Sequence, residues 1–253
     1  MRIFVLGAAD PEMNRIEQHL ATSGEVFVYA MNGAQRVRPN EAYNATPSYP
    51  LPDDAEVVCV ECSLSGIAPA VVIDHHREGD HGFGVPPERF MEGSSLGQVL
   101  ALLGIKPDKD DLYIAAGDHC PVAAYKGQCP GVGPDELFRR RIAQKAEFKK
   151  VGVEAVMVSA SHAMDKLARC QKIKGVHVVR EHIEELPEIA MYTGSQYIAN
   201  LADGKVVASA NAAVITKLKS CPALEATYGD PVRGYMGGTL KEGCTFDDVI
   251  ACL

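Results

Sequence analysis

Short apolar runs alternate with helical patterns through the first half of the chain. Residues 3–6 form an apolar run typical of a buried strand, residues 11–22 have helical spacing, and residues 25–29 resemble the next strand. Two more strand-like runs, at 56–60 and 70–73, are each followed by a carboxylate. This alternation predicts an α/β fold with a mainly parallel sheet and helices on both of its faces.

The middle of the chain is predicted to be largely helical. The polar, proline-bearing stretch 32–54 is expected to be a loop, and the apolar run 111–116 is expected to be another strand, which ends before Asp118. Helical spacing follows Gly93-Ser94-Ser95, which offers an N-cap. The predicted helices of this part cover residues 94–103, 134–150 and 154–170.

From about residue 175 the pattern changes to strands and turns. Runs at 176–179, 197–201 and 206–210 suit strands, and Asp203-Gly204 is a hairpin signal between the last two. We therefore expect three parts: a metal-binding catalytic domain at 1–150, a helical connector at 151–174, and a smaller mixed α/β substrate-binding domain at 175–253.

Composition limits the class of protein. A chain of 253 residues with 47% hydrophobic residues can bury a substantial core. The first apolar run is too short for a signal peptide or a membrane span, so cytoplasmic residence and eight reduced cysteines are expected. A net charge of −8 disfavours extended nucleic-acid binding, whereas a bound divalent cation still allows a small anionic substrate. The oligomeric state stays open, with a homodimer among the options.

Carboxylates and histidines follow the predicted strands. Because the carboxyl ends of parallel strands share one edge of a sheet, side chains distant in sequence can converge there. Hard oxygen ligands with one imidazole suit Mn²⁺ or Mg²⁺, and two such ions about 3.5 to 4 Å apart can activate a bridging water for phosphoryl transfer. The residues in question are Asp10, Glu12, Glu61, Asp74, His75, His76, Asp118 and His119.

The strand-like run that leads into Asp74-His75-His76 resembles the name-giving motif of the DHH phosphoesterases. That family includes RecJ-type exonucleases, oligoribonucleases, cyclic-dinucleotide phosphodiesterases and manganese-type inorganic pyrophosphatases. The flanking motifs occur in the family's order: Asp10-Pro11-Glu12 stands in place of an Asp-x-Asp pair, Glu61 in place of an aspartate, and Gly117-Asp118 as the fourth motif. Together they cover about the first 120 residues.

The resemblance implies a role for each matching residue. Asp74 would orient the site from behind the metal ligands, and His76 would contact the substrate phosphate or assist proton transfer. Glu61 would bridge two Mn²⁺ or Mg²⁺ ions. The implied metal ligands are Asp10, Glu12, Glu61, His75 and Asp118.

Three positions depart from the family pattern. Leu6 stands where a histidine ligand is expected, and glutamates replace aspartates at Glu12 and Glu61. One of two metals would then be held weakly or by other ligands, with His119 or His81 as substitutes. Near the C-terminus, the segment 233–239 is similar to the family's substrate-gripping glycine loop, which implies substrate contacts for Arg233, Gly237 and Gly238. An ordinary turn between strands is the alternative for this segment.

The cysteines allow rival interpretations. Cys59 and Cys62 have metal or redox spacing, but strand alternation predicts opposite faces for them and favours buried small hydrophobes. His119 and Cys120 with Cys129 could form a zinc site. The sequence thus predicts a metal-dependent phosphohydrolase for a small phosphodiester or nucleotide, with a non-catalytic sensor of the same fold or a zinc-dependent hydrolase as alternatives.

Overall fold

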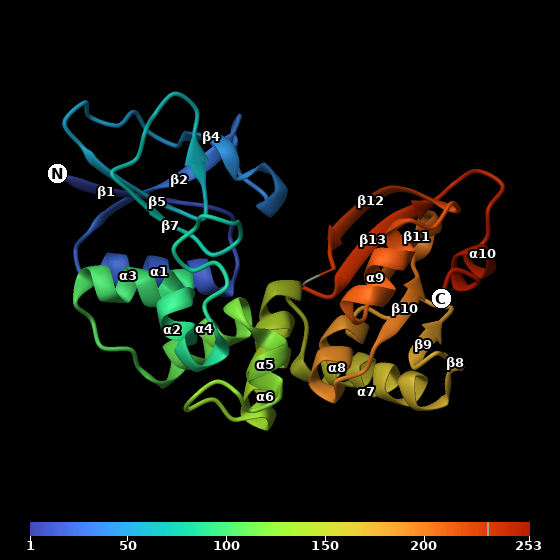
Figure 1. The fold of residues 1–253 in the computed structure, drawn as a ribbon. Coiled ribbons are helices and arrows are strands. Elements are labelled where there is room, and N and C mark those ends of the chain that lie inside the picture. The colour runs from blue at the N-terminus through green and yellow to red at the C-terminus, as the bar shows by residue number, and fades with distance from the viewer. Residues whose placement is uncertain (232) are drawn as a thin grey trace. The chain divides into compact units, whose positions relative to one another are not determined.

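The computed structural model describes residues 1–231 and 233–253, which form two compact units, Met1–Arg140 and Arg141–Leu253 (Figure 1). Each unit is built around its own β-sheet. The expected connector, residues 151–174, packs within the second unit, where α7 (Val153–Arg169) contacts α8 (Leu186–Thr193). None of the described helices has both the length and the apolar character required to cross a membrane.

The first sheet is mainly parallel, as predicted. Its strands are β1 (Arg2–Leu6), β2 (Val26–Asn32), β3 (Gln35–Arg36), β4 (Tyr43–Pro47), β5 (Glu56–Val60), β6 (Ser63–Leu64) and β7 (Val71–Ile73). Their order is β6-β4-β2-β1-β5-β7, with β3 paired to β2, and the four strands β2, β1, β5 and β7 run parallel. The stretch 32–54 was expected to be a loop but contributes β3 and β4, which pair antiparallel to β2.

The two faces of this sheet are covered differently. Helices α1 (Pro11–Thr22), α2 (Phe90–Gly93), α3 (Ser95–Leu103) and α4 (Lys109–His119) pack against one another along one face (Figure 1). Instead of the expected helices, residues between 37 and 67 cover the opposite face. Their apolar side chains pack on Val5, Val57 and Cys59 of the central strands. The carboxyl edge of the sheet therefore opens beside the helical layer.

Helix α4 corrects the predicted strand at 111–116. Asp108 and Asp111 form a reciprocal capping box that starts a helix at Lys109, and Pro121 follows its end. The apolar run contains alanines, and its residues are buried or partly buried all around the helix, so both a strand and a helix satisfy the local pattern. Asp118 consequently lies in the last turn of a helix and not at a strand end.

Local signals explain the helices that flank the sheet. Asp10 caps α1 by accepting a hydrogen bond from Met13 N, and Pro11 occupies the first helical position. Ser94 caps α3 in the same way through Gly97 N, as expected from the sequence. The short α5 (Pro121–Tyr125) and the longer α6 (Pro134–Lys149) follow α4.

The second unit contains a mixed sheet. Its remaining elements are β8 (Lys172–Ile173), β9 (Val176–Val179), β10 (Tyr197–Asn200), β11 (Lys205–Ser209), α9 (Ala212–Lys219), β12 (Leu224–Asp230), β13 (Tyr235–Leu240) and α10 (Phe246–Ile250). The strand order is β12-β13-β11-β10-β9-β8, in which β9 and β10 are parallel. The Asp203-Gly204 hairpin between β10 and β11 is confirmed. Gly237 and Gly238 lie inside β13 and not in a loop, and a side chain at Gly237 would collide with the Tyr228 ring.

Candidate metal centre

Four side chains meet at the carboxyl edge of the first sheet. Each of them offers one ligand atom, and all four atoms lie within 4.8 Å of one another. They come from α1, the end of β5, the turn after β7 and the last turn of α4, and they are Glu12, Glu61, His75 and Asp118. His75 Nε2 lies 3.2 Å from Asp118 Oδ2 and 3.4 Å from Glu61 Oε1.

The backbone at Glu61 is shaped to present its carboxylate. Glu61 leaves β5 with a left-handed φ of 50°, and its N–H donates to Ile73 O of the neighbouring strand. Gly7 packs directly on this turn, since a Cβ there would lie 2.5 Å from Glu61 O. A left-handed glutamate is unusual and is held here by the ends of three parallel strands.

Asp74 anchors the two histidines that follow it. Its Oδ1 accepts hydrogen bonds from His75 N at 2.7 Å and His76 N at 3.0 Å, and it contacts His76 Nδ1 at 2.8 Å. Tyr43 donates its hydroxyl to Oδ2 at 2.7 Å. Burial alone would raise the pKa of Asp74, but the bonds from His76 and Tyr43 lower it to about 2. Asp74 is therefore an ionised support for the segment, as the resemblance implied for it.

His119 fixes the ring of His75. His119 Nε2 lies 3.0 Å from Val85 O, a group that only accepts, so this nitrogen carries the proton. In a neutral His119 ring, Nδ1 then accepts from His75 Nδ1–H at 2.8 Å. That arrangement directs His75 Nε2 towards Glu61 and Asp118, and it is the outer support typical of a metal-binding histidine. The sequence marked His119 only as a possible metal ligand, either as a substitute in this centre or in a zinc site with Cys120 and Cys129.

Negative charge dominates the centre. Burial, Glu61 and Asp118 raise the pKa of Asp10 to about 7. Burial and Asp118 likewise raise the pKa of Glu12 well above its ordinary value. Burial lowers the pKa of His75, but the Asp118 and Glu61 carboxylates beside its Nε2 outweigh this effect and raise the pKa to about 10. The site thus attracts positive charge.

The donor set fits a divalent cation. Among the described residues, the buried oxygens Glu12 Oε2 and Glu61 Oε1 receive no hydrogen bond of normal geometry. Buried carboxylates without donors are costly unless a cation compensates them. Three carboxylates and one imidazole nitrogen are the mixture that Mn²⁺ and Mg²⁺ accept.

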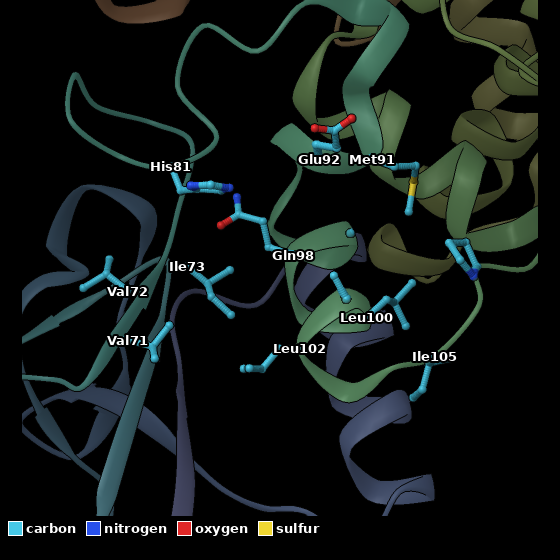
Figure 2. Close-up of a pocket in the computed structure, with 13 residues that line it drawn as sticks. Val71, Val72, Ile73, His81, Met91, Glu92, Gln98, Leu100, Leu102 and Ile105 are labelled. Carbon is cyan, nitrogen blue, oxygen red and sulfur yellow. The ribbon is translucent and has the colours of Figure 1, made fainter.

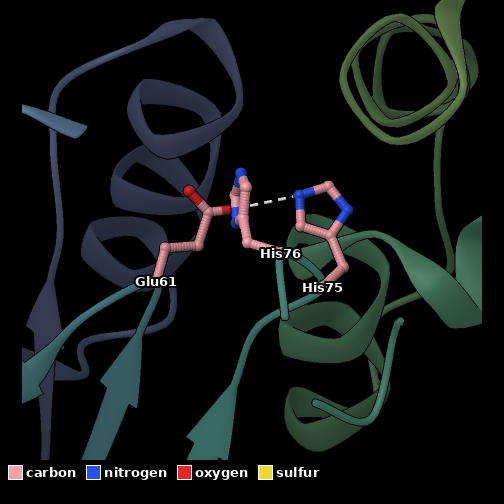
Figure 3. Close-up of side chains that lie close together, drawn as sticks. All are labelled: Glu61, His75 and His76. Carbon is pink, nitrogen blue, oxygen red and sulfur yellow. Dashed lines mark ion pairs between the residues drawn. The ribbon is translucent and has the colours of Figure 1, made fainter. Parts of the chain in front are cut away.

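The other predicted site residues lie around or apart from this group. Asp10 caps α1 through its Oδ1 and influences the cluster through charge. His76 joins Glu61 and His75 in a second, overlapping group, and its side chain is 41% exposed (Figure 3). Arg233 lies exposed in the turn before β13, in the second unit with Gly237 and Gly238.

A cavity of about 690 Å³ lies beside the centre, between β7 and α3. Its wall is mostly apolar, with Ile73 and Leu100 among its lining residues, and His81 and Gln98 supply polar groups at one end (Figure 2). Gln98 Nε2 donates to Gly93 O at 3.0 Å and to Asp74 O at 3.3 Å. The cavity therefore adjoins the segment that carries the histidines, and His81 lines it instead of joining the ligand groups.

The cysteines form pairs. Cys59 and Cys62 are both buried, as predicted, but they lie in one apolar cluster, where Cys62 Sγ donates to Val5 O at 3.4 Å. The expectation of opposite faces was wrong because the left-handed Glu61 breaks the strand alternation. Cys120 Sγ lies 3.2 Å from Cys129 Sγ. Neither potential ligand group found among residues 1–231 and 233–253 contains a thiol.

Comparisons with known proteins give little further information. No protein-family model and no curated protein matches the chain. Among solved structures, the chain is similar to RecJ in complex with Mg²⁺ from Thermus thermophilus, with 12% identity and a TM-score of 0.44. The match covers 99% of this chain and 48% of the RecJ chain, so the chain spans about half of that protein's length. Similarity at this level is not evidence of a shared activity.

Proposed function

We propose that the chain is a metal-dependent phosphohydrolase that uses Mn²⁺ or Mg²⁺. The convergence of Glu12, Glu61, His75 and Asp118 at the carboxyl edge of a parallel sheet is the observation that carries this proposal. These residues would hold the cation. Two ions would be bound, one of them weakly, because Leu6 is an apolar, fully buried side chain where the resemblance calls for a histidine.

When bound, divalent cations lower the pKa of water and neutralise charge on a phosphoryl group. The chain's own residues would supply orientation and proton transfer. Burial lowers the pKa of His76, but its hydrogen bond to Asp74 and the charge of Glu61 raise it overall. A protonated, partly exposed His76 held by Asp74 is suited to protonate a leaving oxygen, the role implied for it by the resemblance.

The proposed substrate is a small phosphodiester or nucleotide. The net charge of −8 disfavours long contacts with a nucleic-acid backbone, whereas a cation at the acidic centre can accept a single phosphate group. Of the substrate contacts that the resemblance implied, only Arg233 stays in the proposal, since a guanidinium can pair with a phosphate, whereas Gly237 and Gly238 are buried inside β13.

The second candidate is a binding module that keeps the metal centre without turnover. The buried Leu6 favours it, since one predicted imidazole ligand is replaced by an apolar group. The two candidates differ in a single observable, which is hydrolysis by the metal-loaded protein.

The test compares the chelated protein with the same protein after addition of Mn²⁺, using an aryl phosphodiester as substrate. We expect Mn²⁺ to restore hydrolysis, and we expect His75→Ala and Asp74→Ala to abolish it. His162→Ala, an exposed histidine in the second unit, is the matched control and should keep full activity. Full activity of purified His75→Ala would refute the enzyme assignment, and Mn²⁺ binding without turnover would select the binding module.

A further inference from the structure

Cys120 and Cys129 lie in thiol–thiol contact at the end of α4, the helix that carries Asp118 and His119. Their Sγ atoms are 3.2 Å apart, Cys120 is partly exposed and Cys129 is buried. Cys120 is also the C-cap of α4, and it follows Asp118 and His119 directly in the sequence. We propose that this pair is a reversible dithiol–disulfide site that controls the metal centre, a link that rests on the proposed function.

The segment between the two cysteines can accommodate the bond. A disulfide needs an S–S separation of about 2.05 Å, so the sulfur atoms must approach by about 1 Å. Cys120 joins α4 to the five-residue α5, and a turn centred on the left-handed Gly127 follows before Cys129. A short helix and a glycine turn can adjust by this amount more readily than the central strands.

The difference in exposure sets the order of the reaction. The accessible Cys120 sulfur loses its proton as it attacks one sulfur of a small disulfide oxidant such as oxidised glutathione, which forms a mixed disulfide and releases one glutathione thiol. The thiol of Cys129 then attacks Cys120 Sγ and releases the second glutathione thiol. Two cysteine thiols lose two electrons and two protons, and one glutathione disulfide gains them.

Oxidation acts on the centre through the end of α4. Asp118 contacts His75 Nε2, and His119 holds His75 Nδ1 and Val85 O. The part of the sulfur movement that is taken up at Cys120, the C-cap of α4, shifts both partners of His75 away from the arrangement of the dithiol form. Since such outer contacts are worth about tenfold or more in metal affinity, we expect Mn²⁺ to bind about tenfold more weakly to the disulfide form.

The experiment compares the reduced protein with the protein treated with oxidised glutathione. After treatment we expect two fewer free thiols than the eight of the chain, a cross-linked peptide that contains Cys120 and Cys129, and an about tenfold rise in the Kd for Mn²⁺. A thiol reductant should reverse all three changes. Cys129→Ser should abolish the cross-link, whereas the control Cys170→Ser, whose neighbour is His177, should retain it.

The outcomes separate the two proposals. A glutathione adduct that stays on Cys120, or two unreacted thiols, overturns the disulfide site, and the wild-type protein alone suffices to show this. A cross-link with unchanged Mn²⁺ affinity overturns the control of the centre. If Mn²⁺ binds neither form, the proposed function fails. The peptide map still decides whether Cys120 and Cys129 form a disulfide.

Discussion

Replacing Glu12 by glutamine tests whether Glu12 is a metal ligand or a carboxylate with a structural role only. Glu12 is 1% exposed, and its Oε1 accepts a hydrogen bond from Leu96 N at 3.0 Å, which the glutamine oxygen can retain. The substitution therefore removes a charge and leaves the packing of α1 on α3 in place. We expect opposite effects on the metal-free and the metal-loaded protein.

The magnitude follows from the spacing of the cluster. Two carboxylates 4.8 Å apart repel each other by about 3.5 kcal/mol at an effective dielectric constant of about 20. Proton uptake relieves part of this repulsion, because the pKa of Glu12 is raised by burial and by Asp118 and Glu61. At pH 9 we expect metal-free Glu12→Gln to be more stable than wild type by about 1 to 3 kcal/mol. Each kcal/mol corresponds to a rise in Tm of roughly 2 to 4 °C.

The loaded protein should behave in the opposite way. Loss of one charged ligand weakens binding by about tenfold or more, so the stabilisation free energy that Mn²⁺ adds should shrink by about 1.4 kcal/mol or more, and the rise in Tm should shrink with it. Differential scanning calorimetry with and without Mn²⁺ measures both effects. Glu17→Gln, on the same helix but paired with Arg36, is the control and should leave the Mn²⁺ response unchanged. A metal-free Glu12→Gln that is less stable than wild type, with an undiminished response to Mn²⁺, would show that Glu12 is structural.

Two further predictions concern the supports of the two units. Gly7→Ala should place a Cβ 2.5 Å from Glu61 O. We expect it to lower the free energy of unfolding, measured by chemical denaturation, by roughly 1 to 3 kcal/mol and to weaken Mn²⁺ binding. The control Gly133→Ala, whose added Cβ would lie 3.5 Å from its nearest atom, should lower the free energy of unfolding far less. Burial raises the pKa of Glu185, but bonds from Lys149 and Ser159 lower it below its ordinary 4.5. The stabilisation is present above this value and is lost as the pH falls through the folded pKa, so the stability deficit of Glu185→Gln at pH 7 should shrink between about pH 5 and 3. A pH-independent deficit would contradict this.

The convergence of the site could be predicted only where sequence patterns were unambiguous. The apolar runs at 56–60 and 70–73 are short and rich in β-branched residues, so β5 and β7 were predicted together with the side chains that follow them. The run at 111–116 contains alanines and a tyrosine, and its length suits a strand or a helix equally. The Asp108–Asp111 capping box was the available signal that it starts a helix.

Features that depend on tertiary contacts had no sequence signal. The left-handed backbone of Glu61 is imposed by its neighbours Gly7 and Ile73, and it alone reverses the expected separation of Cys59 and Cys62. His119 faces His75 because α4 is a helix, so a wrong element assignment also hid its role. The second face of the sheet is covered by the short strands β4 and β6 and the irregular segments beside them, for which hydrophobic periodicity makes no prediction.

If the cluster holds metal as proposed, its geometry favours one firmly held cation over two. The two potential ligand groups both include Glu61 and His75, so they overlap and do not form two separate sites. His75 offers a single ring nitrogen, Nε2, to the cluster, because Nδ1 is bonded to His119. A second ion would have to rely on Asp10, whose Oδ1 already caps α1, and on His76, which is bonded to Asp74. Asp10 Oδ2 and His76 Nε2 could bind it with these hydrogen bonds in place, so a second ion would be the weaker one because it would have to share Glu61 and His75 with the first.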